Sequence, residues 1–264
     1  MRPVLDGLLR DKVVVISGIG PGLGRSLAVR SAQAGADVVL ASRTRKRLDQ
    51  VAEEVTALGR RALVVPTDIT DADDAAALAN RSVEHFGRVD VLINNAFAIP
   101  PLADLADTEL DAIRAGFETT SIAALRLTTL FAPALAESRG SVLMVNSAVL
   151  RHSRRNYGAY KMAKSSLLSL AQSLASELGP QGVRVNSIAP GYIWADSLKW
   201  YLGHLAEQRG VSRDVVYEET AASTDLRKLP EPDEIADAAL FLISDLARIV
   251  TGQCLDVNAG EFHH

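Results

Sequence analysis

The chain has 264 residues, of which 48% are hydrophobic and 23% are charged, and its net charge is -4. This length and apolar content fit one α/β domain with a large core, and they exclude global disorder. The mild negative charge, without any basic stripe interleaved with aromatic residues, argues against a nucleic-acid partner.

The sequence also argues against secretion, a membrane span and a metal site. The single cysteine, Cys254, cannot form an intramolecular disulfide, which is typical of a reducing compartment. The N-terminal segment MRPVLDGLLRDK carries charges where a signal peptide needs its apolar region. No apolar run approaches the roughly 20 residues of a transmembrane helix, and no His/Cys cluster has metal-ligand spacing. We expect a cytoplasmic protein with no membrane partner and no metal.

Short β-branched runs alternate with long helical stretches. Continuous apolar runs, typical of parallel strands covered on both faces, predict strands at Val13–Ser17, Val38–Ser42, Ala62–Pro66, Asp90–Asn94, Ser141–Asn146, Val183–Ile188 and Cys254–Asn258. Helical spacing predicts helices at Leu23–Ala34, Arg45–Leu58, Asp71–Phe86, Leu105–Leu135, Tyr157–Leu178 and Glu231–Ser244. The alternation predicts a single domain over residues 1–264, a doubly wound parallel sheet of Rossmann type in three α/β/α layers.

One region, from Pro190 to about Pro230, interrupts this alternation. It reads as a long irregular insertion before the last helix, and insertions of this length are usually functional lids or binding loops. We expect a substrate lid at approximately 190–230. Its apolar side chains would face Phe97 and Ile99 across a pocket for a bulky apolar ketone or alcohol, or would close an oligomer interface. The lid side chains are Tyr192, Trp194, Trp200, Tyr201, Leu202 and Leu205.

The stretch SGIGPGLG, Ser17–Gly24, follows the first predicted strand and opens the first helix. Glycines at 18, 22 and 24 allow a tight turn that brings backbone N–H groups against a diphosphate at a helix N-terminus. At the first β-to-α turn of a doubly wound sheet, this pattern predicts a dinucleotide site.

The end of the second strand indicates which dinucleotide is bound. An acid there would hydrogen-bond the ribose 2′-hydroxyl, but the chain has Ser42 followed by Arg43. A guanidinium pairs with a phosphate, so Arg43 predicts NADP(H) in preference to NAD(H). The alternative is that Arg43, with Arg45 to Arg47, belongs to a solvated helix start. Asp68, after the third strand, is either a contact for the adenine amino group or the N-cap of the next helix.

The stretch NYGAYKMAK, Asn156–Lys164, offers two candidate Tyr–Lys pairs on a helix. Tyr160 and Lys164 are four residues apart, and so are Tyr157 and Lys161. A phenol that exchanges a proton near pH 7 needs a lowered pKa, which a nearby cation provides. These distances alone leave both pairs open.

The ordered motifs resemble the short-chain dehydrogenase/reductase family over nearly the whole chain. They are SGIGPGLG, the NNA of Asn94–Ala96, Ser147, Tyr-x-x-x-Lys, the PG of Pro190–Gly191 and TGQCLDVNAG near the C-terminus. The family's serine stands thirteen residues before its tyrosine, as Ser147 stands before Tyr160. The resemblance therefore selects Tyr160 and Lys164, and leaves Tyr157 either to line the site or to pack.

The resemblance implies hydride transfer between a nicotinamide and a ketone or secondary alcohol. Tyr160 would be the general acid/base, Lys164 would lower its pKa and hold the ribose, and Ser147 would orient the substrate oxygen. The family also implies a homo-oligomer, a tetramer or a dimer. The implied cofactor residues are Gly18, Pro21, Gly22, Leu23, Gly24, Ser42, Arg43, Thr44, Asp68, Ile69, Asn95, Ala96, Phe97, Tyr160, Lys164, Pro190, Gly191 and Ile193, and the expected substrate residues are Phe97, Tyr157, Trp194 and Tyr201.

Three positions depart from the family pattern. Phe97 replaces the glycine of NNAG, Thr120 replaces an asparagine of the proton relay, and Ala195 replaces a threonine that contacts the carboxamide. Two alternatives follow: an enoyl-thioester reductase that uses Tyr157, whose six-residue separation from Lys164 fits that class, and a cofactor-binding sensor or scaffold without turnover.

Overall fold

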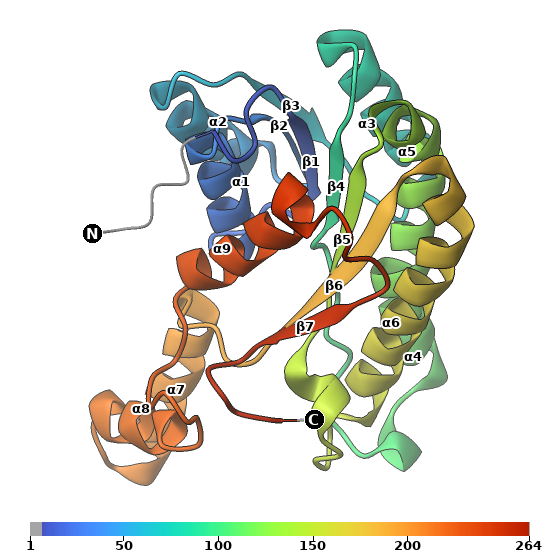
Figure 1. The fold of residues 1–264 in the computed structure, drawn as a ribbon. Coiled ribbons are helices and arrows are strands. Elements are labelled where there is room, and N and C mark those ends of the chain that lie inside the picture. The colour runs from blue at the N-terminus through green and yellow to red at the C-terminus, as the bar shows by residue number, and fades with distance from the viewer. Residues whose placement is uncertain (1–6, 264) are drawn as a thin grey trace.

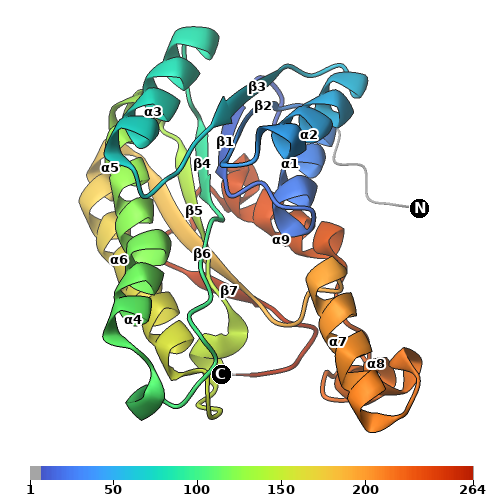
Figure 2. The same ribbon diagram turned by 180° about the vertical axis from the view of Figure 1, so that it is seen from behind.

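The computed structural model describes residues 7–263, which form a seven-stranded sheet between two layers of helices (Figures 1 and 2). Part of the charged N-terminal segment considered above, residues 1–6, lies outside the described residues. The strands are β1 (Val13–Ser17), β2 (Asp37–Ser42), β3 (Ala62–Pro66), β4 (Val91–Asn94), β5 (Ser141–Val145), β6 (Arg184–Pro190) and β7 (Cys254–Val257). The helices are α1 (Leu23–Gln33), α2 (Arg45–Ala57), α3 (Ala72–Phe86), α4 (Leu110–Phe117), α5 (Ala123–Ser138), α6 (Gly158–Leu178), α7 (Asp196–Arg209), α8 (Arg213–Ala221) and α9 (Pro232–Ile243).

All neighbouring strands are parallel, in the order β3-β2-β1-β4-β5-β6-β7. Val14 of β1 pairs with Val38 of β2 on one side and with Val91 of β4 on the other. The chain order therefore reverses between β1 and β4. In open α/β sheets, ligands bind at the carboxyl ends of the strands at such a switch point.

The two layers of helices bury opposite faces of the same strands. Val14 and Ile16 of β1 belong to the core under α1, α2 and α9, whereas Val13 and Val15 belong to the core under α3, α5 and α6. A strand covered on both faces needs apolar residues at every position, which explains the continuous apolar runs of the sequence. The predicted Rossmann-type sheet is confirmed.

The predicted long helix Leu105–Leu135 is wrong at its start and in its middle. Helix α4 begins only at Leu110, and a π-helical segment, Glu118–Ile122, separates it from α5. Within that segment the hydroxyl of Ser121 donates to the carbonyl oxygen of Ala163 in α6, at 3.2 Å. The π turn therefore joins the α4–α5 rod to the helix that carries Tyr160.

The same rod corrects the expectation about apolar runs. By length and composition alone, Leu110–Ser138 meets the criteria for a membrane-spanning helix. In the fold, α5 buries Leu127, Phe131 and Leu135 against the sheet. Core packing accounts for part of its apolar character, while Leu110, Ile122, Leu125 and Leu130 are exposed.

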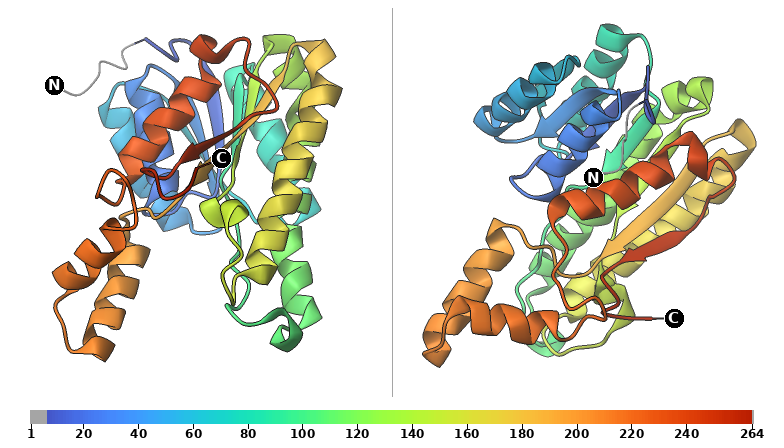
Figure 3. Two further views of the ribbon diagram at one scale, coloured as in Figure 1. Left: turned by 60° about the horizontal axis from the view of Figure 1, so that its bottom comes forward. Right: turned by 60° about the vertical axis from the view of Figure 1, so that its left-hand side comes forward.

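The segment expected to be an irregular lid is instead helical. Helices α7 and α8 project from the body of the molecule as an arm, here defined as residues 194–229 (Figures 1 and 3). Gly210 ends α7 at φ +64, and the hydroxyl of Ser212 accepts from the N–H of Val215 to start α8. The two helices enclose a small core of their own, formed by Leu202, Ala206, Val216, Ala221 and Leu229.

Candidate active site

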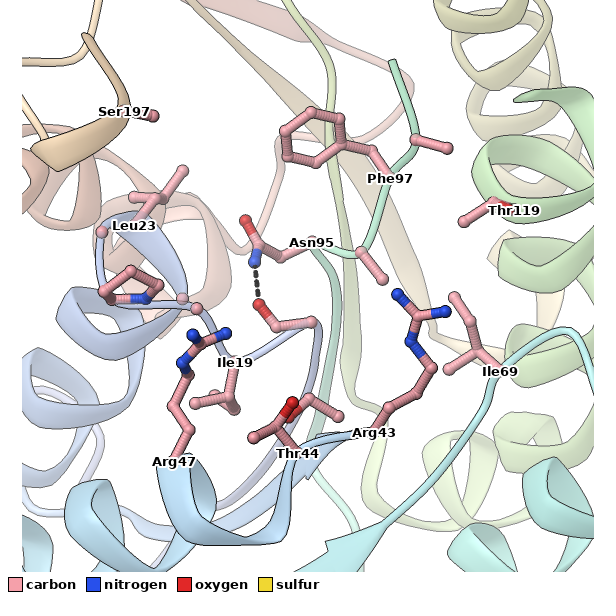
Figure 4. Close-up of a pocket in the computed structure, with 18 of the residues that line it drawn as sticks. Ile19, Leu23, Arg43, Thr44, Arg47, Ile69, Asn95, Phe97, Thr119 and Ser197 are labelled. Atoms are coloured by element: carbon pink, nitrogen blue, oxygen red, sulfur yellow. Dashed lines mark hydrogen bonds between the residues drawn. The ribbon is translucent and has the colours of Figure 1, made fainter. Parts of the chain in front are cut away.

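The loop between β1 and α1 requires glycine at two positions. Gly18 has φ +85, and a Cβ there would lie 2.5 Å from the Cα of Ala96. A Cβ on Gly24 would lie 2.4 Å from the carbonyl oxygen of Gly18. The Nδ2 of Asn95 donates to that oxygen at 2.6 Å (Figure 4). The loop is therefore fixed against the end of β4, where larger side chains do not fit.

The N-terminus of α1 fits an anionic group. Its N-cap residue, Gly22, offers no side-chain acceptor to the first N–H groups, and its first turn has no acidic residue. Free backbone donors and the positive end of the helix dipole attract phosphate. The residues present thus suit the diphosphate of a dinucleotide.

A cavity of about 590 Å³ lies over this loop, at the carboxyl ends of the strands (Figure 4). The predicted cofactor residues that line it are Gly18, Pro21, Gly22, Leu23, Gly24, Ser42, Arg43, Thr44, Asp68, Ile69, Asn95, Ala96, Phe97 and Ile193. Four other predicted cofactor residues, Tyr160, Lys164, Pro190 and Gly191, do not line it. A Cβ on Gly191 would lie 3.0 Å from the Cβ of Asn258, so Gly191 packs against the C-terminal segment instead.

Two arginines reach the cavity near the end of β2. Arg43 and Arg47 extend into it from either side of Thr44 (Figure 4). Arg47 was interpreted from sequence only as part of a solvated helix start. Its position three residues after the N-cap Thr44 turns it back toward the loop, and this spacing was the available signal. Arg45, by contrast, pairs with Asp49 at 3.6 Å.

Asp68 lines the cavity and does not cap α3. The N-cap is Asp71, whose Oδ1 accepts from the N–H groups of Asp73 and Asp74. Asp68 instead accepts from the N–H and hydroxyl of Thr70 at 3.0 and 2.6 Å. These hydrogen bonds, together with the charge of Arg43, lower the pKa of Asp68.

Sequence reasoning missed several other lining residues. Most are neighbours of predicted positions, but Thr119 comes from the π segment, and its place depends on the register of that turn (Figure 4). The missed residues are Ile19, Gly20, Arg47, Thr67, Thr70, Ala98, Thr119, Asp196 and Ser197.

Ser147, Tyr160 and Lys164 come together at the ends of β5 and α6. Ser147 follows β5, while Tyr160 and Lys164 lie one turn apart near the start of α6. The hydroxyl of Ser147 accepts from the N–H of Val149 at 3.2 Å, and its proximity opposes part of the rise in the Tyr160 pKa. The Nζ of Lys164 donates to the carbonyl oxygen of Val145 at 2.7 Å and lies 5.9 Å from the centroid of the Tyr160 ring. Lys164 is completely buried.

Burial shifts the pKa values of both members of the pair. It raises the pKa of Tyr160 to about 12, and the nearby hydroxyl of Ser147 only partly opposes this. Burial also lowers the pKa of Lys164 to about 7. Desolvation dominates both groups, and the ammonium of Lys164 hydrogen-bonds a carbonyl oxygen and not the phenol. That Lys164 lowers the Tyr160 pKa when the cofactor is bound stays a prediction.

Tyr157 and Lys161 do not form the second pair. The Tyr157 ring meets His152 edge-on, with centroids 5.5 Å apart. The Nζ of Lys161 donates to the carbonyl oxygen of His152 and to the hydroxyl of Ser153, at 2.6 and 3.0 Å. Tyr157 thus packs against His152, and Lys161 holds the loop at residues 152–153.

Thr120 and Ala195 occupy different parts of the site. Thr120 lies in the π segment, and its hydroxyl is buried without a hydrogen-bond partner among the described residues. Ala195 lines the cavity, where its Cβ would be 3.0 Å from a Cβ placed on Gly22.

The expected substrate residues separate into two groups. Phe97 lines the cavity, and Tyr157 stands at the start of α6. Trp194 belongs to the arm, where its ring meets that of Tyr217 at 4.7 Å, and Tyr201 is about half exposed on α7. Trp194 and Tyr201 do not line the cavity, because the arm uses Trp194 for its own packing.

Comparisons with known proteins agree on the family. A family model described as enoyl-(acyl carrier protein) reductase matches residues 18–261. The 7alpha-hydroxysteroid dehydrogenase of Escherichia coli is 33% identical over 257 residues, covering 97% of this chain and 94% of that protein.

Two solved structures share the fold over almost the whole chain. A 7 alpha-hydroxysteroid dehydrogenase, complexed with NADH and 7-oxo glycochenodeoxycholic acid, matches with a TM-score of 0.86 at 31% identity, over 97% of this chain and 96% of that one. L-Sorbose reductase from Gluconobacter frateurii, complexed with NADPH and L-sorbose, matches with a TM-score of 0.93 at 25% identity, over 98% and 99%.

The chain belongs to the short-chain dehydrogenase/reductase family, as its motifs predicted. It is an oxidoreductase whose relatives act on hydroxyl or keto groups with a nicotinamide cofactor. Because one neighbour holds NADH and the other NADPH, and one acts on a steroid and the other on a sugar, family membership alone decides neither the cofactor nor the substrate.

Proposed function

We propose that this protein transfers a hydride between NADP(H) and a bulky, largely apolar ketone or secondary alcohol. One observation carries the proposal: Ser147, Tyr160 and Lys164 converge beside a cavity over the glycine loop that has Arg43, and no acid, after β2. The cavity supports the proposed cofactor binding, and the three side chains support the proposed proton transfer.

Each of the three side chains has a distinct task. The Oη of Tyr160 gives a proton to the substrate oxygen or takes one from it. The hydroxyl of Ser147, which lies beside Tyr160, holds that oxygen near the phenol. The Nζ of Lys164 holds the nicotinamide ribose, and its charge favours the phenolate. When bound, the nicotinamide accepts or supplies the hydride, and its oxidised form adds positive charge that opposes the raised Tyr160 pKa.

The NADP(H) preference rests on Arg43, with Arg47 as a second cation at the same end of the cavity. A charge-assisted hydrogen bond contributes about 1.5–3 kcal/mol, so Arg43→Ala should weaken NADPH binding by about 10- to 150-fold. Binding of NADH should be unchanged, and nicotinamide fluorescence measures both. Arg45→Ala is the matched control, since the side chain of Arg45 is 71% exposed and forms a salt bridge with Asp49. If the ratio of the Kd for NADPH to the Kd for NADH is the same in Arg43→Ala as in the wild type, this assignment is wrong.

The substrate class rests on the apolar residues that flank the site. Phe97 and Ile99 are exposed at 48% and 57% beside the cavity, and Tyr157 is half-buried near Ser147. A panel of ketones assayed with NADPH should give the highest kcat/KM for cyclic or otherwise bulky apolar members. Fastest turnover of small charged ketones would overturn this part.

Two other functions remain to be tested against it. The description of the matching family model favours an enoyl-thioester reductase, but the ammonium of Lys164 contacts the Tyr160 ring and Tyr157 packs on His152. NADPH-dependent reduction of a short enoyl-CoA that is abolished by Tyr157→Phe would favour that alternative. Cofactor binding without oxidation of NADPH across the carbonyl panel would favour a sensor or scaffold.

We also propose a homo-oligomer in the cytoplasm. Apolar side chains are exposed along α4, α5 and the start of α6, where helices of two copies would pack. They are Leu110, Ile122, Leu125, Leu130 and Met162. Sedimentation at micromolar concentration should give a dimer or tetramer, and a monomer would refute it. The single thiol supports the cytoplasmic location, which cell fractionation tests.

A further inference from the structure

Phe97, where the family pattern has glycine, touches the buried catalytic lysine. The Nζ of Lys164 lies 5.0 Å from the centroid of the Phe97 ring, which is a cation–π contact. The Phe97 and Tyr160 rings are 6.5 Å apart and tilted by 46°. Phe97 itself lines the cavity, whereas Lys164 and Tyr160 do not. The ring is therefore the contact between the cavity and the catalytic pair.

The surroundings of Lys164 leave its ammonium with few other partners. Within residues 7–263, its one hydrogen bond goes to the carbonyl oxygen of Val145, and it makes no salt bridge. Lys164 is 1% exposed, so a ribose in the cavity reaches Nζ only after a covering side chain has moved, and Phe97 both lines the cavity and lies over Nζ.

The backbone around Phe97 permits such a movement. Before it, Asn95 is fixed by hydrogen bonds to Ser17 and Gly18. After it, Pro100 is buried and packs against Gly116 of α4. Between these two anchors, the N–H groups of residues 96–99 have no hydrogen-bond acceptor within the described chain. This short stretch can change conformation without breaking a backbone hydrogen bond.

We propose that Phe97 is a gate on Lys164, with two positions of its ring. In one, seen here, the ring covers the ammonium. In the other, the ring turns away and Nζ can hydrogen-bond the nicotinamide ribose. Phe97 is thus a positioning residue that acts through Lys164, and this inference rests on the proposed role of Lys164 in holding the ribose. A cation–π contact of this kind favours the closed position by about 2- to 30-fold.

The first test needs no cofactor. Amine labelling with trinitrobenzenesulfonate, read by peptide mass spectrometry, reports how often Nζ of Lys164 is uncovered. Labelling of Lys164 should rise by about 2- to 30-fold in Phe97→Ala and Phe97→Leu, and stay at the wild-type level in Phe97→Tyr, which keeps the ring. Ile99→Ala, on the same stretch, is the matched control. Equal labelling in wild type and Phe97→Ala would overturn the gate whatever the function.

The second test follows NADPH binding by stopped-flow nicotinamide fluorescence. In the wild type the observed rate should level off as NADPH rises, because opening of the gate becomes limiting. In Phe97→Ala it should rise linearly, and Kd should fall by about 2- to 30-fold. Normal NADPH binding with identical kinetics in both proteins would remove the gate and leave the proposed function intact. Failure of the wild type to bind NADPH or NADH would remove the proposed function, and with it the role of the gate.

Discussion

The cofactor end of the site and the arm beside it are built by different means. At the cofactor end, backbone atoms define the shape: Gly18 and Gly24 lie too close to their neighbours to carry a Cβ, and Asn95 ties the loop to β4. In the arm, side chains define the shape, since α7 and α8 share a small apolar core around Leu202 and Val216. Backbone-defined sites tolerate little variation, whereas a side-chain core can be repacked. The loop that fits a dinucleotide follows the first design, and the arm follows the second.

The largest effect should come from Tyr160, the proposed proton donor. Tyr160→Phe removes the proton donor but keeps the ring, so kcat should fall by about 10²- to 10⁴-fold while NADPH affinity is unchanged. Steady-state kinetics and fluorescence titration measure the two quantities. Tyr157→Phe is the control and should retain most activity, because Tyr157 packs against His152. The reverse pattern would transfer the proton chemistry to Tyr157.

A second prediction tests whether the backbone at the cofactor end can accept a Cβ on Gly18. Gly18 and Gly59 both have positive φ, at +85 and +76, but only a Cβ on Gly18 meets a neighbour. Each Gly→Ala change should cost about 1–2 kcal/mol of unfolding free energy from the backbone conformation. Gly18→Ala alone should also lose NADPH binding, because Ala96 must move. Urea unfolding measures the stability of each variant, and fluorescence titration measures its NADPH binding. Equal losses of NADPH binding in Gly18→Ala and Gly59→Ala would show that the close approach of Gly18 to Ala96 is not what matters.

A third prediction concerns the buried ammonium. Since burial lowers the pKa of Lys164 from 10.5 to about 7, the unfolded chain binds more protons than the folded one between those values, and this group makes stability rise with pH there. Lys164→Met removes the titrating group. Its Tm should exceed that of the wild type most at pH 7 and below, and the difference should shrink toward pH 10. A difference that is constant with pH would show that Lys164 is not desolvated.

The smallest effect on the stability of the whole molecule is expected for a change in the arm. Trp194→Ala removes a half-buried ring that contacts Tyr217, so cleavage within residues 196–221 by a protease should become faster, by the equivalent of about 1–3 kcal/mol of local stability. The sheet should keep its Tm. Trp200→Ala is the control, because Trp200 is 71% exposed and should change local stability by less than about 0.5 kcal/mol. Global unfolding of Trp194→Ala at a much lower temperature would show that the arm and the body are one unit.

The sequence was most informative where the backbone determines the structure. Strands β1 and β3 have the predicted bounds, and the glycine loop stands where its pattern placed it. The arm was missed because aromatic residues near 194–201 suggested a pocket wall. The helical spacing of Leu202 and Ala206, four residues apart, was the signal that could have revealed α7.

Other features depend on distant partners and had no local signal. The π turn at Thr120 depends on how α5 packs against α6, and sequence spacing alone describes a regular helix. The raised pKa of Tyr160 arises from burial by several elements, so a Tyr–Lys spacing predicts the pair but not its electrostatics. The contact of Phe97 with Lys164 joins residues far apart in the chain and needed the fold.

The pairing of α1 with α9 has a consequence for the timing of folding. Ser26 donates to Asp233, and Arg30 donates to Asp237 at 2.7 Å, across a separation of 207 residues in both cases. At about 5–20 residues per second, a ribosome needs about 10–40 s to make the intervening chain. Throughout that interval the helix that bears the glycine loop lacks the partner that covers it. The dinucleotide loop is thus among the first parts of the protein to be synthesised and among the last to be fully assembled.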